Sequence, residues 1–552
     1  MAMETSRCDH NTCSNKPTKG GWKSAIFIIF VEIGERFAYY GVSGNLIRYL
    51  TIVLKQPVAT AAQNVNVWHG VAALFPLVGG FLADSYFGRF NMIFFSSITY
   101  LLGLVMLVIS VAIIPVKHRV LPFFIALHVI NVGEGGHRPC IQTFAADQFD
   151  EDIPEEKAAK SSFFNWWYLG IVFGAIAATL VVSYVQDNRS WVLGYAITAI
   201  VVAAAFVVFL AGKSTYRQEV KVRNPLTKVA RVIVAALRKR KLSLEKEFDM
   251  YVEGEESGDA KTRYLARTNQ FRFLDKAAII DDRDKSSAKH EEWRLCTVNE
   301  VEQVKLLIRL LPIWISCTIF TVVIAQLGTF YTKQAGTLNR TIGSTHFEIP
   351  PASFQVIVGL TILTVVPIYE RVIIPAAKRL TKQPSGITML QRIGFGIFFS
   401  ILTMMVAALV ESKRISVVKD QGLMDVPDPN LPMSAWWLVP QFVLMGVADM
   451  LTIVGLQELF YDQVPDEMRS MGAAAYLSIL GVGSFMSTAL ISVIQMVTAR
   501  RGDEWLKGNN INKLHLDGFY WLLACLSGFG LVMYVVLAKG FVYKKLQRDA
   551  EA

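Results

Sequence analysis

The sequence predicts an all-α membrane protein in which twelve transmembrane helices form two six-helix bundles joined by a long linker. Only 18% of the 552 residues are charged and 53% are hydrophobic, which is too little charge to cover a soluble chain of this length. Apolar stretches of about 20 residues, long enough to cross a bilayer, recur along the chain. They fall into two groups of six on either side of a polar segment, 213–305.

Each apolar stretch is expected to be a helix, because the backbone of a segment in lipid must satisfy its own hydrogen bonds. The expected spans cover residues 25–51, 67–84, 92–116, 121–144, 163–185 and 191–210 in the first group, and 306–331, 354–374, 389–410, 437–460, 476–497 and 519–542 in the second. The predicted order is an N-terminal tail (1–24), a first bundle (25–212), a central loop (213–305), a second bundle (306–542) and a C-terminal tail (543–552).

The charge distribution predicts the orientation in the membrane. The central loop is net basic and is therefore expected to be cytoplasmic, and an even number of spans then puts both termini in the cytoplasm. The loop 147–160 is acidic, against the rule, but acidic residues contribute little to orientation. Asn339 begins an Asn-Arg-Thr sequon on the expected outer side and is a glycosylation candidate. We expect the plasma membrane, with the vacuolar membrane as the alternative.

The net charge of +10 has a membrane explanation as well. Cytoplasmic loops of membrane proteins concentrate Lys and Arg, so no nucleic-acid partner is expected. Within the central loop, residues 225–241 have the pattern of an amphipathic helix with a basic end. Such a helix would lie on the inner leaflet, pack beneath the bundles, or simply space the two halves of the chain.

Nothing in the sequence supports an enzymatic function. The six cysteines and eight histidines are scattered, without the spacing of a disulfide framework, a metal site or a nucleophile–base pair. We therefore expect neither catalytic residues nor metal ligands.

The first expected span carries three charged residues, Glu32, Glu35 and Arg36, within FVEIGERFAYYG. Their spacing places them on one face of a helix. Each charge at the bilayer centre costs roughly 2.5–3.5 kcal/mol on insertion scales, so the three are expected to pair and to border a watery cavity. A carboxylate in a partly dry site can take up a proton near neutral pH, whereas Arg keeps its charge. The pattern predicts a proton-driven switch; the alternative is that the pairs only hold helices together.

The loop after the second span reads GFLADSYFGR, residues 80–89. It resembles the loop between helices two and three of the major facilitator superfamily, with its G-x-L-x-D and G-R pattern. The resemblance implies the major facilitator fold. It also implies that Asp84 and Arg89 latch neighbouring helices on the cytoplasmic face.

The first span resembles the first helix of the proton-coupled oligopeptide transporters, and specifically of their plant nitrate/peptide branch, through its E-x-x-E-R-F-x-Y-Y-G pattern. Further matching segments are GEGGHRPCIQTFAADQFD (133–150), FFNWWY (163–168), FRFLDKA (271–277), FEIPPAS (347–353) and GLQELFYDQVPDEMRS (455–470). The resemblance extends over residues 20–545. It implies alternating access, in which two bundles rock around a site near the bilayer midplane.

In this family the charged residues of the first helix mediate proton coupling, which assigns that role to Glu32, Glu35 and Arg36. The family's fourth-helix Lys falls on Arg138, which completes the proton-coupling set. An Arg keeps the positive charge but cannot give up a proton, so coupling would rest on the glutamates. A proton-independent carrier therefore stays open.

The resemblance also fixes the expected substrate site. Tyr39, Tyr40, Gln326 and Asp449 are expected to line it, with Asp449 at the family's tenth-helix acid. In peptide carriers of the family an Arg that helps bind the peptide occupies the position of Ser43. The family's set of peptide-binding residues is therefore incomplete here.

Two fixed cations favour an anion or a zwitterion as the solute. The predicted function is a proton-coupled symporter of a small anionic or zwitterionic solute, such as nitrate or a di- or tripeptide. The alternative is a proton-independent facilitator or exchanger of an organic anion or plant hormone. The expected partners are the solute and the lipid bilayer, with protons as the coupling ion and no other cofactor, and the expected state is a monomer or weak dimer.

Overall fold

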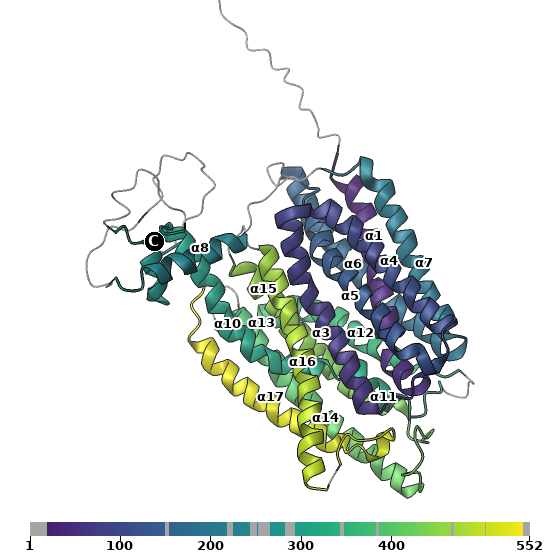
Figure 1. The fold of residues 1–552 in the computed structure, drawn as a ribbon. Coiled ribbons are helices and arrows are strands. Elements are labelled where there is room, and N and C mark those ends of the chain that lie inside the picture. The colour runs from purple at the N-terminus through teal and green to yellow at the C-terminus, as the bar shows by residue number, and fades with distance from the viewer. Residues whose placement is uncertain are drawn as a thin grey trace, which may run out of the picture.

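The computed structural model describes residues 19–149, 154–217, 225–242, 251, 265–281, 293–342, 347–381, 386–464, 469–502 and 504–544. These residues fold almost entirely into helices, and no β-strand occurs among them. The helices form the two bundles that the sequence predicts (Figure 1).

The first bundle contains six long helices. They are α1 (Trp22–Ser43), α3 (Val58–Leu82), α4 (Arg89–Ala112), α5 (Val116–Ala146), α6 (Pro154–Asn188) and α7 (Trp191–Ala211), with the short α2 (Leu46–Arg48), η1 (Tyr49–Val53), η2 (Ala83–Phe87) and η3 (Gly212–Ser214) at their ends.

The second bundle also contains six spans, three of which are built from consecutive helical pieces. The pieces are α10 (Val298–Ile324), η5 (Leu327–Tyr331) and α11 (Thr332–Ala335); η6 (Pro351–Gln355), α12 (Val356–Ile368), η7 (Tyr369–Ile373) and α13 (Ile374–Thr381); then α14 (Met389–Asp420), η8 (Ala435–Leu438), α15 (Val439–Asp462), α16 (Arg469–Arg500), η10 (Ile511–Lys513) and α17 (Leu516–Lys539).

All twelve expected spans are helical, and ten of the described helices are long and apolar enough to cross a membrane. The other two long helices, α1 and α5, carry charged residues within their apolar stretches, among them Glu32, Glu35, Glu134 and Arg138. Several helices extend beyond the expected spans: α3 begins at Val58 and α14 continues to Asp420. Hydropathy detects the part of a helix that lies in lipid. The extension of α3 is instead packed through small residues such as Ala59 and Ala62, which are fully buried.

Within the first bundle α1 packs against α6 and α7, and α5 packs against α3 and α4. In the second bundle α14 packs against α15 and α17. The largest contact between the bundles joins α3 to α16, which run side by side at the centre of the molecule (Figure 1).

Glycines in α5 allow its close approach to α3 and α4. A Cβ added at Gly79 of α3 would lie 2.1 Å from the carbonyl oxygen of Gly135, and one added at Gly133 would lie 2.5 Å from the backbone nitrogen of Tyr100. Neither distance is compatible with a side chain. The glycine-rich GEGG sequence therefore sets the depth at which α5 holds Arg138.

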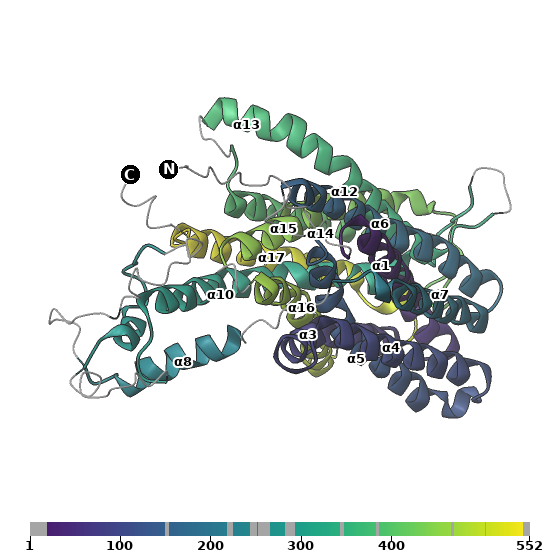
Figure 2. The same cartoon turned by 90° about the horizontal axis from the view of Figure 1, so that it is seen from above.

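Helix α8 (Pro225–Arg238) belongs to the central segment and lies beside α10, outside the two bundles (Figure 2). Its residues Val232, Ala235 and Ala236 pack with η4 (Arg272–Ala278) and with the start of α10. The amphipathic helix expected at 225–241 is present, and part of its apolar face is covered by the chain itself.

Candidate functional site

A cavity of about 410 Å³ lies between the two bundles. Its two sides differ in chemistry. The first bundle contributes polar side chains, among them Tyr39, Tyr40, Ser43, Asn66, His69 and Arg138. The second bundle contributes mainly aliphatic ones, among them Ile324, Val356, Val358, Ile362, Ile453 and Leu480, together with the carboxyl group of Asp449. The site therefore offers one polar wall and one apolar wall.

Five charged side chains from α1 and α5 form a continuous chain of ion pairs beside this cavity. Arg36 Nε lies 2.7 Å from Glu32 Oε1 and 3.3 Å from Glu35 Oε2. Arg138 Nε lies 3.4 Å from Glu35 Oε1, and its Nη2 lies 2.7 Å from Glu134 Oε1. Glu35 consequently sits between two guanidinium groups. The Glu32–Arg36 and Glu134–Arg138 pairs follow from four-residue spacing along each helix, and Glu35 joins the two helices through Arg138.

The carboxylates of this chain are withdrawn from solvent. The exposed fractions of Glu32, Glu35 and Glu134 are 1%, 3% and 0%. Of the five charged residues, Arg138 lines the cavity, whereas the glutamates and Arg36 lie behind it. Three carboxylates face two guanidinium groups, so the fully ionised cluster holds more negative than positive charge. Burial makes such an excess costly.

Tyr39 connects the ion-pair chain to the cavity wall. The guanidinium carbon of Arg138 lies 4.2 Å from the centroid of the Tyr39 ring. Three more rings surround it: Tyr40 meets it edge to face at 5.3 Å, Trp68 stacks on it at 5.6 Å, and His69 Nδ1 lies 2.8 Å from the Tyr39 hydroxyl. A cation held over an aromatic face is stabilised by the ring's quadrupole.

Two residues of the site were missed by the sequence reasoning. Glu134 occurs in the GEGGHRPC segment, four residues before Arg138, and this spacing within an apolar span was the available signal. His69 lies on α3, near the start of the expected span 67–84, in a stretch that mixes polar and apolar residues. Nothing in its local sequence distinguishes it from a packed core histidine.

The four expected substrate residues separate into two groups. Tyr39, Tyr40 and Asp449 line the cavity. Gln326 does not: it is completely buried, and its amide donates hydrogen bonds to the Val322 carbonyl and the Ser487 hydroxyl. The turn between α10 and η5 directs Gln326 into the packing between helices, which hydropathy alone does not indicate.

The expected helix 2–3 latch is described in part. Arg89, at the first position of α4, forms an ion pair with Asp147 at the end of α5, so it does join neighbouring helices. Asp84 lies in η2, but its side chain is outside the described residues. The glycosylation candidate Asn339 is partly buried in the loop after α11, and its side-chain oxygen accepts hydrogen bonds from the backbone and hydroxyl of Thr341.

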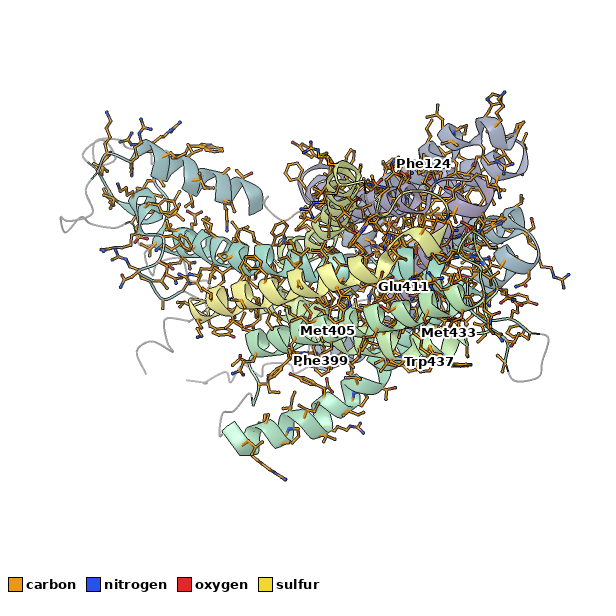
Figure 3. All side chains as sticks on the ribbon, turned by 90° about the horizontal axis from the view of Figure 1, so that it is seen from below. Phe124, Phe399, Met405, Glu411, Met433 and Trp437 are labelled. Atoms are coloured by element: carbon orange, nitrogen blue, oxygen red, sulfur yellow. The ribbon has the colours of Figure 1, made fainter. Side chains whose placement is uncertain are left out.

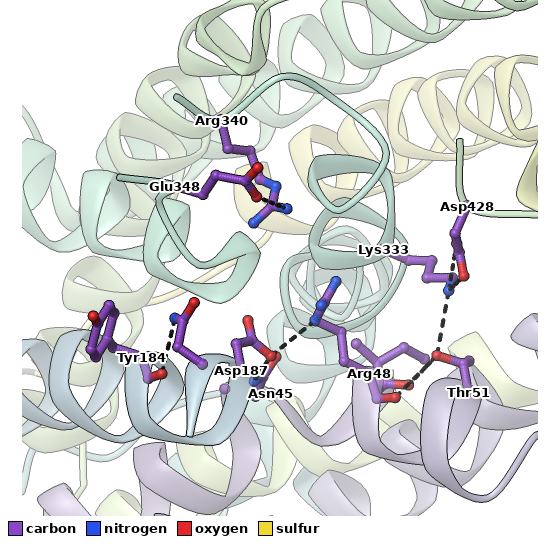
Figure 4. A network of polar contacts seen from close by, with 12 residues as sticks. Asn45, Arg48, Thr51, Tyr184, Asp187, Lys333, Arg340, Glu348 and Asp428 are labelled. Atoms are coloured by element: carbon purple, nitrogen blue, oxygen red, sulfur yellow. Dashed lines mark hydrogen bonds and ion pairs between the residues drawn. The ribbon is translucent and has the colours of Figure 1, made fainter. Parts of the chain in front are cut away.

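The bundles also meet at the end that lies away from the central segment (Figure 4). Arg48 Nε lies 3.3 Å from Asp187 Oδ1, within the first bundle. Lys333 of α11 pairs with Asp428 at 2.7 Å, within the second. The Lys333 ammonium also donates to the Thr51 hydroxyl at 3.5 Å, which links the two bundles across the interface. This end is therefore closed by polar contacts.

Comparison with known proteins agrees with this architecture. The sequence profile of the POT family matches residues 90–509. Protein NRT1/PTR FAMILY 5.4 of Arabidopsis thaliana is 52% identical over 546 residues, which is 98% of each chain. Protein NRT1/PTR FAMILY 5.10 of the same plant is 47% identical, over 96% of this chain and 95% of its own.

Solved structures share the fold at low sequence identity. The POT family transporter PepTSo matches with a TM-score of 0.69 and 21% identity, over 94% of this chain and 98% of its own. An auto-inhibited POT family peptide transporter matches with a TM-score of 0.68 and 20% identity, over 94% and 97%. The chain therefore belongs to the NRT1/PTR family of plant membrane transporters, a part of the POT family.

Proposed function

We propose that this transporter is a proton-coupled symporter that moves a small anionic or zwitterionic solute by alternating access. The observation that carries the proposal is the chain of five buried charges beside the cavity, in which three carboxylates share two guanidinium groups. One bound proton balances the charge of this cluster. Because burial penalises a net charge, proton uptake and rearrangement of the cluster are coupled.

Glu35 occupies the decisive position in this scheme. Its two oxygens face Arg36 and Arg138 at 3.3 and 3.4 Å, so its protonation weakens both attractions at once. Arg138 then keeps Glu134 as its carboxylate partner, and the part of its guanidinium that faced Glu35 becomes available to an anionic solute in the cavity. Protons are taken up at Glu32 and Glu35, and the solute is held by Arg138, Tyr39 and the opposite wall.

The solute is expected to carry a negative charge, since Arg138 is the cation on the cavity wall. Nitrate and di- or tripeptides satisfy this requirement. The aliphatic wall of the second bundle favours a second candidate, an organic anion with an apolar body. Asp449 would repel such an anion if ionised, but would bind the amino group of a zwitterion.

Uptake into proteoliposomes tests the proposal. The purified protein is given an inward proton gradient and a panel of nitrate, alanyl-alanine and phenylacetate. We expect accumulation of at least one solute above equilibrium and its loss in Glu35→Gln, while exchange of the same solute without a gradient continues. The matched control is Glu348→Gln in the outer loop, where the carboxylate is exposed and pairs with Arg340. Gradient-driven accumulation that persists in Glu35→Gln would show that the proton site has been assigned incorrectly.

A further inference from the structure

His69 lies on the polar wall of the cavity and takes no part in the ion-pair chain. It projects from α3, which is anchored to α5 by two hydrogen bonds. The neighbouring Trp68 is 1% exposed, and its indole donates to the Leu127 carbonyl at 3.1 Å, while Asn131 donates to the Trp68 carbonyl at 3.0 Å. These bonds fix the turn of α3 that carries His69 against α5.

The imidazole ring itself is held by aromatic neighbours. Trp68 contacts it edge to face at 5.0 Å between centroids, and Tyr39 does so at 6.0 Å. Its Nδ1 lies 2.8 Å from the Tyr39 hydroxyl. When the Tyr39 hydroxyl donates to Nδ1, the neutral ring carries its own hydrogen on Nε2. The Arg138 guanidinium over the Tyr39 ring favours this arrangement, because it makes the hydroxyl a better donor.

His69 lines the cavity, and Nε2 is the ring nitrogen that does not bond to Tyr39. Among the described residues, none forms a hydrogen bond with Nε2 of His69. A Cβ added at Gly328, across the cavity in the second bundle, would lie 3.7 Å from Nε2. Gly328 thus leaves room for a ligand group beside this nitrogen, and both residues line the same cavity.

We infer that His69 is a solute-binding residue: its Nε2–H and the Arg138 guanidinium form a two-donor site for the anionic group of the transported solute. This inference rests on one part of the proposed function, namely that the cavity is the solute-binding site. It does not depend on proton coupling. Tyr39 lies between the two donors, touching Arg138 with its ring face and His69 with its hydroxyl. It therefore acts as a positioning residue that keeps the imidazole aimed at the solute.

The opposite wall narrows the class of ligand. The two groups donate hydrogen bonds to one carboxylate, and the aliphatic side chains Ile324, Val358 and Ile453 then contact the rest of the solute. A monocarboxylate with an apolar body fills both walls, whereas nitrate occupies only the polar one. We expect phenylacetate to bind more tightly than nitrate.

Binding to the purified protein in detergent, without a proton gradient, tests this inference. The readout is the apparent Kd from thermal stabilisation by phenylacetate, nitrate and alanyl-alanine. His69→Ala should weaken phenylacetate binding about tenfold, the usual effect of losing one hydrogen bond to a charged group. His69→Gln, which keeps a donor, should recover part of the loss. Tyr39→Phe should weaken binding less, and its effect should not add to that of His69→Ala because the two residues share one hydrogen bond.

A second variant leaves His69 in place. Gly328→Ala puts a methyl group at ordinary contact distance from Nε2 and should weaken phenylacetate binding without loss of thermal stability. The histidine control is His128→Ala on α5, where the side chain is exposed and lies outside the cavity. Equal affinity in wild type, His69→Ala and Gly328→Ala would overturn the inference, as would a wild-type protein that binds none of the three probes. Failure of Glu35→Gln to abolish accumulation would refute proton coupling alone.

Discussion

At the scale of single residues, Arg138 does more than supply a positive charge. Its guanidinium reaches Glu35 and Glu134 and stacks on Tyr39, whereas the ammonium of a Lys is a point charge without a planar face. We expect Arg138→Lys to reduce gradient-driven uptake about tenfold and Arg138→Ala to reduce it about a hundredfold or more, because Ala removes the ion pair of the buried Glu134 and leaves Glu35 paired with Arg36 alone. Initial uptake rates per amount of reconstituted protein measure both.

The control for this pair is Lys117→Ala, an exposed cation at the start of the same helix. Its uptake should equal that of the wild type. Equal losses in Arg138→Lys and Arg138→Ala would mean that the planar geometry of the guanidinium, and not its charge, is the essential property.

Sequence reasoning found the charged residues that break an apolar span, and it missed those that tertiary contact makes important. Glu32, Glu35 and Arg36 stood out because charge inside a span is costly. His69 belongs to the site through its contact with Tyr39, thirty positions away in sequence. Gln326 does not line the cavity, because a turn in the helix directs it into the packing between helices. Such orientations depend on the neighbouring helices and leave no periodic signal.

At the scale of elements, every span was predictable, since a stretch of about twenty apolar residues in lipid satisfies its backbone hydrogen bonds by forming a helix. The ends of the helices were not. Helix α14 continues to Asp420 because Glu411 and Arg414, which hydropathy places outside the membrane, are both completely buried. Figure 3 shows Glu411 following Phe399 and Met405 along this helix.

The Glu411–Arg414 pair should matter for stability. Arg414 Nη2 lies 2.6 Å from Glu411 Oε1, and its Nη1 donates to Asn512 at 2.7 Å, which ties α14 to η10. Removing one partner of a buried pair typically costs about 3–5 kcal/mol. Arg414→Met should therefore lower the melting temperature of the detergent-solubilised protein by several degrees, as followed by the fluorescence of its tryptophans.

A matched surface pair provides the comparison. Lys507 and Glu504 form an ion pair with both side chains more than half exposed, so Lys507→Ala should leave the melting temperature unchanged. If Arg414→Met also has the melting temperature of the wild type, the buried pair contributes no net stability, and Glu411 must have found another partner.

At the scale of the whole molecule, the two-bundle architecture followed from the grouping of the spans, but the way in which the bundles meet did not. Their contact relies on polar side chains such as Asn66, whose amide donates to Ser487 at 3.0 Å, and Gln63, which donates to Ser492 at 2.9 Å. Isolated polar residues on apolar helices do not reveal their partners in sequence. The cavity, built from both bundles, was therefore predictable only in part.

Closure of the end that holds α11 should set the balance between the two transport states. Lys333 joins the bundles there through Thr51 and is itself held by Asp428. In Lys333→Ala the closed arrangement loses this contact, which shifts the two-state equilibrium about two- to fivefold toward opening at that end. Labelling of a Gly359→Cys reporter measures the shift, because Gly359 lines the cavity and an added Cβ there meets no atom within 4 Å.

The reporter is used in a background in which the other cysteines are replaced, with a membrane-impermeant thiol reagent applied from the α11 side. Lys333→Ala should speed labelling about two- to fivefold, in proportion to the open population. Lys413→Ala should leave it unchanged, because Lys413 lies 3.6 Å over the Trp437 ring and both residues belong to the second bundle. If Lys333→Ala labels no faster than Lys413→Ala, closure at this end depends on the packing of α3 against α16. The polar contacts then form as a consequence of closure and do not cause it.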